Sequence, residues 1–328
     1  DGQILQEGIC EVGAMASFMA AGSAYAVHGL PMIPFYIFYS MFGFQRVGDM
    51  IWSCGDMMCK GFLLGGTAGR TTLNGEGLQH QDGHSHILAS TVPNLRSYDP
   101  AFGFEVAALV REGMHQMYEL QQDVFYYLTL YNENYPMQSL TQIAEQSQTD
   151  EATVLQGVIA GGYCCYRGLE AAECSVHILA SGSIMQQALL AKDILEGSEI
   201  GVCIWSMTSF IELQRDALAC QQYNRENPQA QAKVSRLEQM FQSESGVFIA
   251  VTDYMAALAQ GIAAWMPAGF EVLGTDGYGL SESRSRLREH FSVDAVAVAE
   301  ASVSALYRNR HMTEDKFAAV MQTVRHGN

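Results

Sequence analysis

Three histidines and an aspartate lie close together in a glycine-rich segment, residues 74–86. They are His80, Asp82, His84 and His86. Imidazole and carboxylate groups are the usual ligands of zinc and iron, so one hypothesis is a metal site. A second hypothesis is a substrate loop, because glycine permits tight turns and histidine can relay a proton near neutral pH. For His84 and His86, a purely structural role in hydrogen-bonding the loop is equally open.

The spacing of these residues favours the substrate loop over the metal site. Three ligands so near in sequence would crowd one another, and no further ligand motif such as His-Glu-x-x-His accompanies them. We therefore expect no metal ligands in this segment. A metal-dependent hydrolase built on His80, His84 and His86 is kept as an alternative function.

The elements that must position this segment alternate between strand and helix. Residues 94–99 and 124–130 are predicted to be strands, and the second is a continuous run of apolar and aromatic residues. Residues 101–118, which lie between them, are predicted to form a helix. A polar stretch follows, residues 135–151, and beyond it the alternation resumes. This pattern predicts an α/β protein with two domains, the second with a mainly parallel sheet. The expected boundaries are residues 1–140 for the first domain, 141–151 for a linker and 152–328 for the second domain.

Composition excludes several classes of function. The formal net charge is −17, with 35 acidic and 18 basic side chains, so neither nucleic acid nor an anionic membrane surface is an expected partner. No apolar run reaches the roughly 20 residues that span a bilayer. The eight cysteines lack paired Cys-x-x-Cys spacing, and the first residues do not resemble a secretion signal. Reduced thiols and a cytoplasmic location are expected.

Several long phrases resemble one known family. They run in the family's order along nearly the whole chain: residues 4–13, 30–46, 70–80, 132–135, and 275–279 followed by Ser283-Arg284. On these phrases the chain resembles the homodimeric, bacterial type of pyruvate dehydrogenase, the first component of the pyruvate dehydrogenase complex. This family belongs to the transketolase-like thiamine-diphosphate superfamily.

The resemblance implies a role for particular residues. Glu11 matches the glutamate that hydrogen-bonds the ring nitrogen of the cofactor's aminopyrimidine and promotes its imino tautomer. Phe42 matches the aromatic residue that stacks on the aminopyrimidine, and Tyr39 and Glu76 match positions that line the active centre. His80 matches a histidine that acts on the substrate, either by binding the pyruvate carboxylate or by assisting proton transfer.

The resemblance also implies a fold, a reaction and partners. The first domain is expected to be a pyrimidine-binding domain truncated at its start, and the second a transketolase C-terminal-like domain. The implied reaction is the thiamine-diphosphate-dependent oxidative decarboxylation of pyruvate, with the acetyl unit passing to the lipoyl group of the acetyltransferase component. A homodimer is expected, because the superfamily forms its active site between subunits.

Only the pyrimidine end of thiamine diphosphate is expected to bind this chain. The family's magnesium and diphosphate motif, Gly-Asp-Gly followed later by Asn, belongs to an amino-terminal domain and does not occur here in a suitable context. The chain alone is therefore expected to be inactive, and a non-catalytic dimerisation module is a further alternative.

Overall fold

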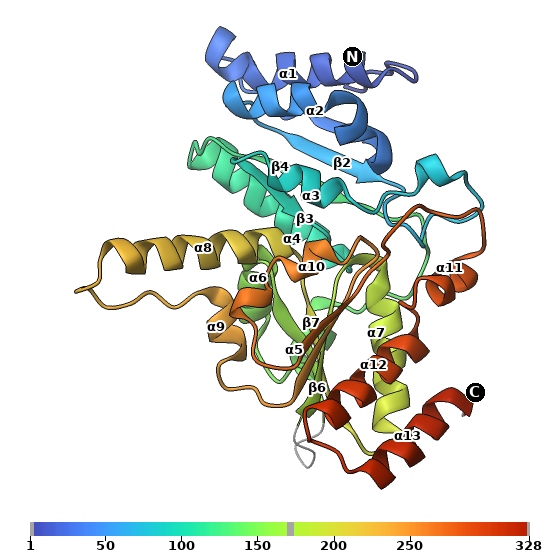
Figure 1. The fold of residues 1–328 in the computed structure, drawn as a ribbon. Helices are drawn as coiled ribbons and strands as arrows, with labels where there is room; N and C mark the ends of the chain where they lie inside the picture. The colour runs from blue at the N-terminus through green and yellow to red at the C-terminus, as the bar shows by residue number, and fades with distance from the viewer. Residues whose placement is uncertain (1–2, 169–173, 327–328) are drawn as a thin grey trace.

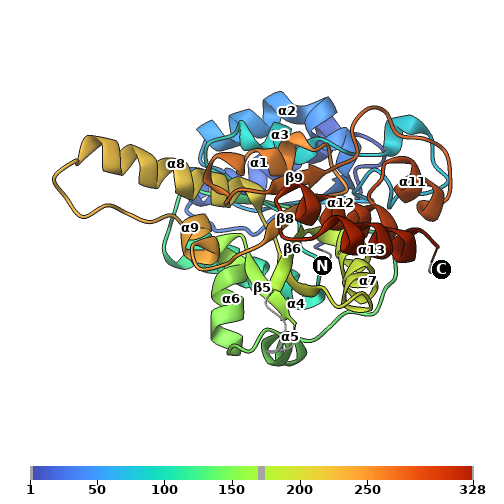
Figure 2. The same cartoon turned by 60° about the horizontal axis from the view of Figure 1, so that its bottom comes forward.

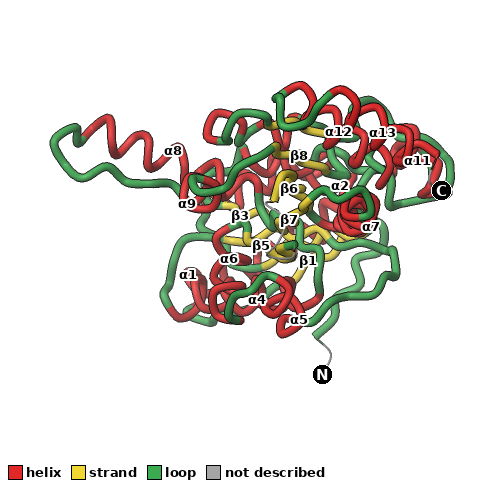
Figure 3. The backbone as a smooth tube through the Cα atoms, turned by 90° about the horizontal axis from the view of Figure 1, so that it is seen from below, coloured by secondary structure: helices red, strands yellow, loops and turns green. Residues whose placement is uncertain are grey.

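Two β-sheets organise the part of the chain that the computed structural model describes, residues 3–168 and 174–326. Figure 1 shows the first sheet in the upper half of the molecule, beside α1 and α2, and the second sheet in the lower half. Seen from below, the strands lie at the centre and the helices around them (Figure 3). The amino-terminal end of the chain belongs to the first sheet and the carboxyl-terminal end to the second.

The elements follow one another without long irregular stretches between most of them. The first sheet and its helices comprise α1 (Glu11–His28), β1 (Phe35–Tyr39), α2 (Ser40–Asp56), β2 (Phe62–Gly66), the 3-10 helix η1 (Leu78–His80), α3 (Ser85–Ser90), β3 (Leu95–Tyr98), α4 (Gly103–Met114), the π-helical turn η2 (His115–Glu119) and β4 (Phe125–Thr129). The second sheet and its helices comprise α5 (Leu140–Gln146), α6 (Glu151–Ala160), β5 (Tyr163–Arg167), β6 (Cys174–Ala180), η3 (Gly182–Ile184), α7 (Met185–Glu196), β7 (Gly201–Ser206), α8 (Phe210–Glu226), α9 (Arg236–Phe241), β8 (Val247–Val251), α10 (Ala257–Gln260), η4 (Ala263–Trp265), β9 (Phe270–Leu273), α11 (Arg284–His290), α12 (Ala295–Arg308) and α13 (Glu314–His326).

Both sheets are built mainly from parallel strands. The first has the order β1-β2-β4-β3, and every neighbouring pair is parallel. The second has the order β5-β7-β6-β8-β9, and only the pair of β5 with β7 is antiparallel. The predicted α/β fold with a mainly parallel second sheet is confirmed.

The central strands are buried along their whole length. Every residue of β4, β7 and β8 is buried, as expected for parallel strands covered by helices on both faces. Helices α7, α12 and α13 lie together on one side of the second sheet, while α8 projects away from the body of the protein (Figure 2). One continuous buried apolar cluster includes residues of both sheets, among them Tyr126 of β4 and Ile204 of β7. The two sheets are therefore packed as one body.

Helix α1 packs closely on the chain that leads into β2, because Gly22 has no side chain. A Cβ on Gly22 of α1 would stand 2.7 Å from the carbonyl oxygen of Lys60, just before β2. The small residues of α1 therefore set how closely this helix approaches the chain beneath it. This packing places the start of α1, and with it Glu11, beside α2.

Most predicted elements occur where the sequence indicated. The strands expected at residues 94–99 and 124–130 are β3 and β4, and the helix expected at 101–118 is α4 continued by η2. The expected linker, residues 141–151, contains most of α5, so the domain boundaries stay a prediction. Strands β1 and β2 and the long helix α8 were not predicted.

The expectation for the cysteines is wrong at one position. Among the cysteine side chains that the structure describes, six are free thiols, but Cys203 in β7 is disulfide-bonded. The prediction relied on the absence of closely paired cysteines, which does not exclude a disulfide between cysteines that are far apart in the sequence. No helix in the described ranges is long and apolar enough to cross a membrane.

Candidate active site

The carboxyl ends of the two sheets face one another. Asp99, directly after β3, accepts a hydrogen bond of 2.6 Å from the hydroxyl of Ser181, directly after β6. The backbone repeats this connection, because the N–H of Gly182 donates to the carbonyl of Asp99 at 3.1 Å. Ligands of open α/β sheets bind outside the carboxyl ends of the strands. This edge is where the predicted site residues lie.

Glu11 and Phe42 are brought together by a residue that lies between them. The guanidinium of Arg46 donates to Oε1 of Glu11 at 2.6 Å, and its Cζ atom lies 4.0 Å from the centre of the Phe42 ring. Glu11 is the first residue of α1, and Phe42 and Arg46 lie one turn apart in α2. The Glu11 side chain is only 17% exposed. A largely buried carboxylate and an aromatic ring therefore border the same small space.

His80 continues this group on the other side of Phe42. The two rings meet edge to face with 5.2 Å between centroids, and the Tyr39 ring lies 5.9 Å from that of His80. Nδ1 of His80 lies 2.8 Å from Oε2 of Glu76, four residues earlier in the chain. All five predicted site residues thus belong to one contiguous group, which Arg46 completes.

The loop that carries Glu76 and His80 is anchored by a buried carboxylate. Asp253, just after β8, accepts from the backbone N–H of Thr71 at 2.8 Å and of Thr72 at 3.2 Å. The two threonine hydroxyls donate to the same carboxylate, each at 2.6 Å. Gly69 has a φ of +86°, and a Cβ there would stand 2.2 Å from Asp253, so the turn requires glycine. The second sheet therefore holds the start of a loop that follows β2.

Two further side chains fix the far end of the same loop. The amide of buried Gln81 donates to the carbonyls of Leu73 and Leu280 at 2.8 and 2.9 Å and accepts from the N–H of Leu280 at 2.7 Å. Asp82 accepts from the Ser40 hydroxyl at 2.7 Å, where β1 passes into α2. With both ends held, the loop presents Glu76 and His80 on a rigid support.

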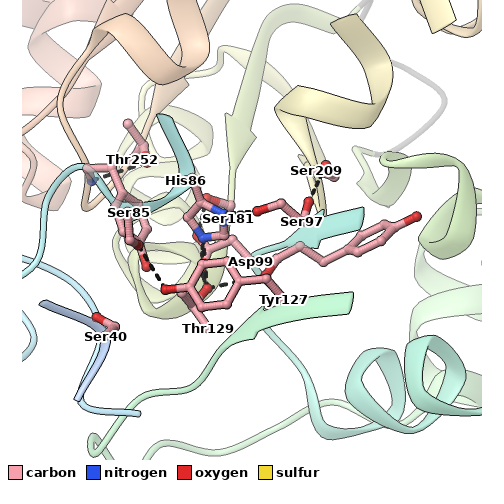
Figure 4. Close-up of polar contacts among 12 residues, drawn as sticks. Ser40, Ser85, His86, Ser97, Asp99, Tyr127, Thr129, Ser181, Ser209 and Thr252 are labelled. Carbon is pink, nitrogen blue, oxygen red and sulfur yellow. Dashed lines mark hydrogen bonds and ion pairs between the residues drawn. The ribbon is translucent and has the colours of Figure 1, made fainter. Parts of the chain in front are cut away.

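His86 belongs to a buried polar network below the site (Figure 4). Its Nδ1 lies 2.7 Å from the Ser97 hydroxyl and its Nε2 lies 2.9 Å from the Thr129 hydroxyl. Thr129 in turn donates to Asp99 at 2.6 Å. Burial lowers the pKa of His86, and the negative charges of Asp99 and Asp82 only partly oppose this shift. His86 is therefore a neutral structural residue near pH 7.

The three histidines do not converge on a common point. His80 contacts Glu76, His84 contacts the amide of Gln45, and both ring nitrogens of His86 face hydroxyl groups. Within the described ranges, no group of three or more His, Cys, Asp or Glu side chains could hold a metal ion. The geometry gives no support to the metal-dependent hydrolase.

Comparison with known proteins decides the family. Residues 1–138 match the family model of the pyruvate dehydrogenase E1 component middle domain, and residues 161–294 match that of the transketolase-like C-terminal domain. The pyruvate dehydrogenase E1 component of Pseudomonas aeruginosa is 50% identical over 307 residues, which cover 93% of this chain and 34% of that relative. The E1 component of Escherichia coli strain K12 is 46% identical over 308 residues, covering 93% of this chain and 33% of the relative.

The chain belongs to the pyruvate dehydrogenase E1 component family. It spans about a third of the length of these curated relatives. Among solved structures, the transketolase from Leishmania mexicana superposes with a TM-score of 0.67 at 18% identity, covering 92% of this chain and 37% of that one. At this identity the likeness shows the transketolase-like fold alone.

Three important residues of this E1 chain were not singled out from the sequence. Arg46 ended one of the phrases that resemble the family but was given no role, Asp99 was the last residue of a predicted strand, and Asp253 was given no role. A weak signal existed for the two aspartates, since polar residues directly after buried parallel strands gather at one edge of a sheet. No sequence signal paired Arg46 with Glu11, because the two residues are 35 positions apart and meet only through the packing of α1 on α2.

The group of site residues has two ends that differ in chemistry. At one end, Glu11 and Phe42 present a carboxylate beside an aromatic face, which suits a flat nitrogen heterocycle with donors in its plane. At the other end, Glu76 orients the His80 ring through Nδ1. In the described part of the chain Nε2 of His80 has no hydrogen-bond partner, so it is the nitrogen that can meet a substrate.

Proposed function

We propose that this chain supplies the pyrimidine-binding side of the active site of a thiamine-diphosphate-dependent pyruvate dehydrogenase. The supporting observation is the contiguous group that runs from Glu11 through Arg46 and Phe42 to His80. It stands at the carboxyl end of a parallel sheet, in a chain about half identical to pyruvate dehydrogenase E1 components. The reaction proposed is the oxidative decarboxylation of pyruvate.

The residues present fit the aminopyrimidine end of the cofactor. The Glu11 side chain is mostly buried, so a hydrogen bond from its carboxyl group to a ring nitrogen is little weakened by water. The ring of Phe42 already contacts a flat group, the guanidinium of Arg46. The Cζ atom of Arg46 lies 4.0 Å from the ring centroid, the distance of a stacked contact. When bound, thiamine diphosphate supplies the electron sink for decarboxylation. Glu11 would hold the ring and move a proton at its nitrogen, and Phe42 would fix its plane.

His80, Glu76 and Tyr39 form the proposed substrate end. The Glu76 carboxylate fixes the orientation of the His80 ring through Nδ1. Nε2 of His80 can then donate to the carboxylate or the keto oxygen of pyruvate. Tyr39 is 48% exposed at the end of β1, and we assign it to the lining of the substrate end. These groups bind and orient the substrate, while the cofactor carries the bond-breaking step.

The rest of the catalytic unit is proposed to lie outside residues 1–328. Only the pyrimidine end is assigned to this chain, and the diphosphate and magnesium contacts are assigned to another domain of the enzyme. We expect the enzyme to be a homodimer that transfers the acetyl unit to the lipoyl group of the acetyltransferase component. Isolated on its own, this chain is expected to be inactive.

The test of this function is the release of carbon dioxide from pyruvate by the full-length enzyme. Release should require both thiamine diphosphate and magnesium, and pyruvate should be preferred over longer 2-oxo acids. Adding lipoylated acetyltransferase domain should yield acetyl-dihydrolipoamide. If carbon dioxide release does not depend on thiamine diphosphate, the proposed function is wrong.

A further inference from the structure

Seven non-glycine residues in the described part of the chain have a positive φ angle, the left-handed conformation that glycine adopts most easily. Six of them lie within three residues of the end of a helix, where a left-handed residue commonly closes the last turn: Met58, Gln121, Gln148, Glu199, Ser292 and Arg310. The seventh, Thr67, follows a strand and not a helix. Helix capping therefore does not explain the conformation of Thr67.

The side chain of Thr67 makes this conformation costly. Its φ is +54°, and a side chain that branches at Cβ crowds the backbone in the left-handed region. Such strain persists only where the surrounding structure fixes the backbone, and it is concentrated at binding and catalytic sites. Leu130, directly after β4, fixes the backbone on both sides of Thr67. It donates to the carbonyl of Gly65 at 2.8 Å and accepts from the N–H of Ala68 at 3.0 Å. The chain thus holds a strained residue in one defined place.

Thr67 lies beside the proposed substrate end of the site. It is the first residue after β2, whose last residue, Gly66, is the register partner of Tyr39 in β1. The Tyr39 ring lies 5.9 Å from that of His80. A Cβ on Gly65 would stand 2.8 Å from Cβ of Ser40, the first residue of α2, so the end of β2 approaches this helix closely. Thr67 therefore belongs to the edge of the sheet where ligands of α/β proteins bind.

The polar groups of Thr67 are not committed to any distant part of the fold. Its side chain is half-buried, and its hydroxyl donates only to the carbonyl of the preceding residue, Gly66, at 2.6 Å. Within residues 3–168 and 174–326, no other group hydrogen-bonds the main-chain N–H or carbonyl of Thr67. A threonine hydroxyl rotates and can exchange one acceptor for another. The hydroxyl can therefore turn to a ligand without breaking a contact between two elements.

We propose that Thr67 is a further substrate-binding residue, whose hydroxyl donates a hydrogen bond to an oxygen of the 2-oxo acid. This inference deepens the proposed function and rests on it, because it takes the group around Tyr39 and His80 as the substrate end. The carboxylate and keto oxygens of a 2-oxo acid only accept hydrogen bonds, so the site must supply donors. His80 supplies one from the loop, and Thr67 supplies another from the end of β2. The strained backbone of Thr67 places this donor before the substrate arrives.

The test compares two variants of the full-length enzyme at saturating thiamine diphosphate and magnesium. Thr67→Val keeps the shape of the side chain and removes the hydroxyl, whereas Thr67→Ser keeps the hydroxyl. In Thr67→Val, kcat/KM for pyruvate should fall by about 10- to 100-fold, the usual effect of losing one hydrogen bond to a charged group. In Thr67→Ser it should stay within about 3-fold of wild type. The Kd of thiamine diphosphate and the melting temperature should not change in either variant. A wild-type kcat/KM in Thr67→Val would overturn the proposal.

A third variant separates loss of the hydroxyl from damage to the fold. Thr67→Gly removes the hydroxyl and also relieves the backbone strain, so it should be at least as heat-stable as wild type and still lose kcat/KM as Thr67→Val does. The matched control is Gln148→Gly, which relieves the same strain at an exposed residue after α5, where φ is +57°. It should keep both the stability and the kcat/KM of wild type or exceed the stability. Normal kcat/KM in Thr67→Gly contradicts the proposal even if Thr67→Val does not fold.

The proposed function fails in a different way from this inference. If carbon dioxide release by wild type does not depend on thiamine diphosphate, both ideas are wrong. If wild type behaves as proposed and Thr67→Val and Thr67→Gly turn over pyruvate normally, only the role of Thr67 is wrong.

Discussion

Asp99 and Ser181 join the carboxyl ends of the two sheets through a single hydrogen bond of 2.6 Å. The other oxygen of the Asp99 carboxylate accepts from the hydroxyls of Thr129 and Tyr131. Asp99 is 4% exposed, so these three hydroxyl donors replace the water that an ionised carboxylate requires. The residue therefore couples β3, β4 and β6 at the edge where the site is formed.

Replacement of Asp99 should destabilise the chain. Asp99→Asn removes the negative charge that the three hydroxyl donors stabilise and turns one acceptor oxygen into a donor, so the charge-assisted hydrogen bonds of this cluster are weakened or lost. We expect the free energy of unfolding to fall by about 1 to 3 kcal/mol, the usual effect of an unsatisfied buried polar group. Urea denaturation followed by circular dichroism measures this change.

The exposed Asp315 in α13 provides the matched control for Asp99. Asp315→Asn makes the same chemical change at the surface, where substitutions usually alter stability by less than about 0.5 kcal/mol. Equal stability of the Asp99 and Asp315 variants would contradict the coupling role of Asp99.

Asp253 should affect turnover more than cofactor affinity. In Asp253→Asn the carboxylate that anchors Thr71 and Thr72 is lost, and the loop that carries Glu76 and His80 is loosened. Small misplacement of catalytic groups is costly, so kcat in the full-length enzyme should fall by about 10-fold or more. The Kd of thiamine diphosphate should stay within about 3-fold, because Glu11 and Phe42 lie on α1 and α2. A large loss of cofactor affinity with normal kcat would contradict this assignment.

His86 should make stability depend on pH just below neutrality. Its pKa is lowered in the folded chain by burial, so the unfolded chain, with a pKa near 6.5, binds the proton first as pH falls. Stability is fully present above about pH 6.5 and declines below it, by at most about 1.4 kcal/mol per pH unit, until the folded-state pKa is reached. His86→Gln should show a shallower slope than wild type, whatever its absolute stability; the slope that remains comes from buried His177, whose pKa is also lowered by burial. Urea midpoints between pH 5 and 8 measure both slopes, and parallel curves for variant and wild type would refute the expectation.

The sequence predicted buried strands better than the strands of the site. Strand β4 was recognisable because its apolar run is uninterrupted. Strand β1 was missed because it passes directly into α2 at Ser40, with no glycine or proline between them. The aromatic stretch 35–44 thus contains a strand and the start of a helix. Neither the two-residue period of a strand nor the 3.6-residue period of a helix dominates its pattern of apolar residues. Strand β2 was also missed, because two of its five residues are glycines and these are untypical of strands.

The candidate site was predictable only through family resemblance. Residue types and spacing singled out the loop of His80 but also suggested a metal cluster, which the geometry does not support. Contacts between Arg46 and Glu11, or between Asp253 and Thr71, join positions 35 and 182 residues apart. Such contacts depend on how helices and sheets pack, and no local pattern in the sequence encodes them.

His80 and Glu76 should act as a pair. His80→Ala should lower kcat/KM for pyruvate by about 10²- to 10⁴-fold, the usual range for loss of a positioned proton donor. Glu76→Ala should have a smaller effect, because it leaves the imidazole but removes the 2.8 Å contact that orients it. The double variant should be no worse than His80→Ala alone, since residues that work through one contact are not additive. Fully additive losses would show that the two side chains act independently.

The central claim is that Glu11 carries the proton relay to the aminopyrimidine, and Glu11→Gln in the full-length enzyme tests it most directly. Glutamine keeps the size and a hydrogen-bonding group but cannot exchange a proton near neutral pH. Carbon dioxide release from pyruvate, measured at saturating thiamine diphosphate and magnesium, should fall by about 10²-fold or more. Turnover within a few-fold of wild type, with the cofactor fully bound, would contradict the assignment of this site.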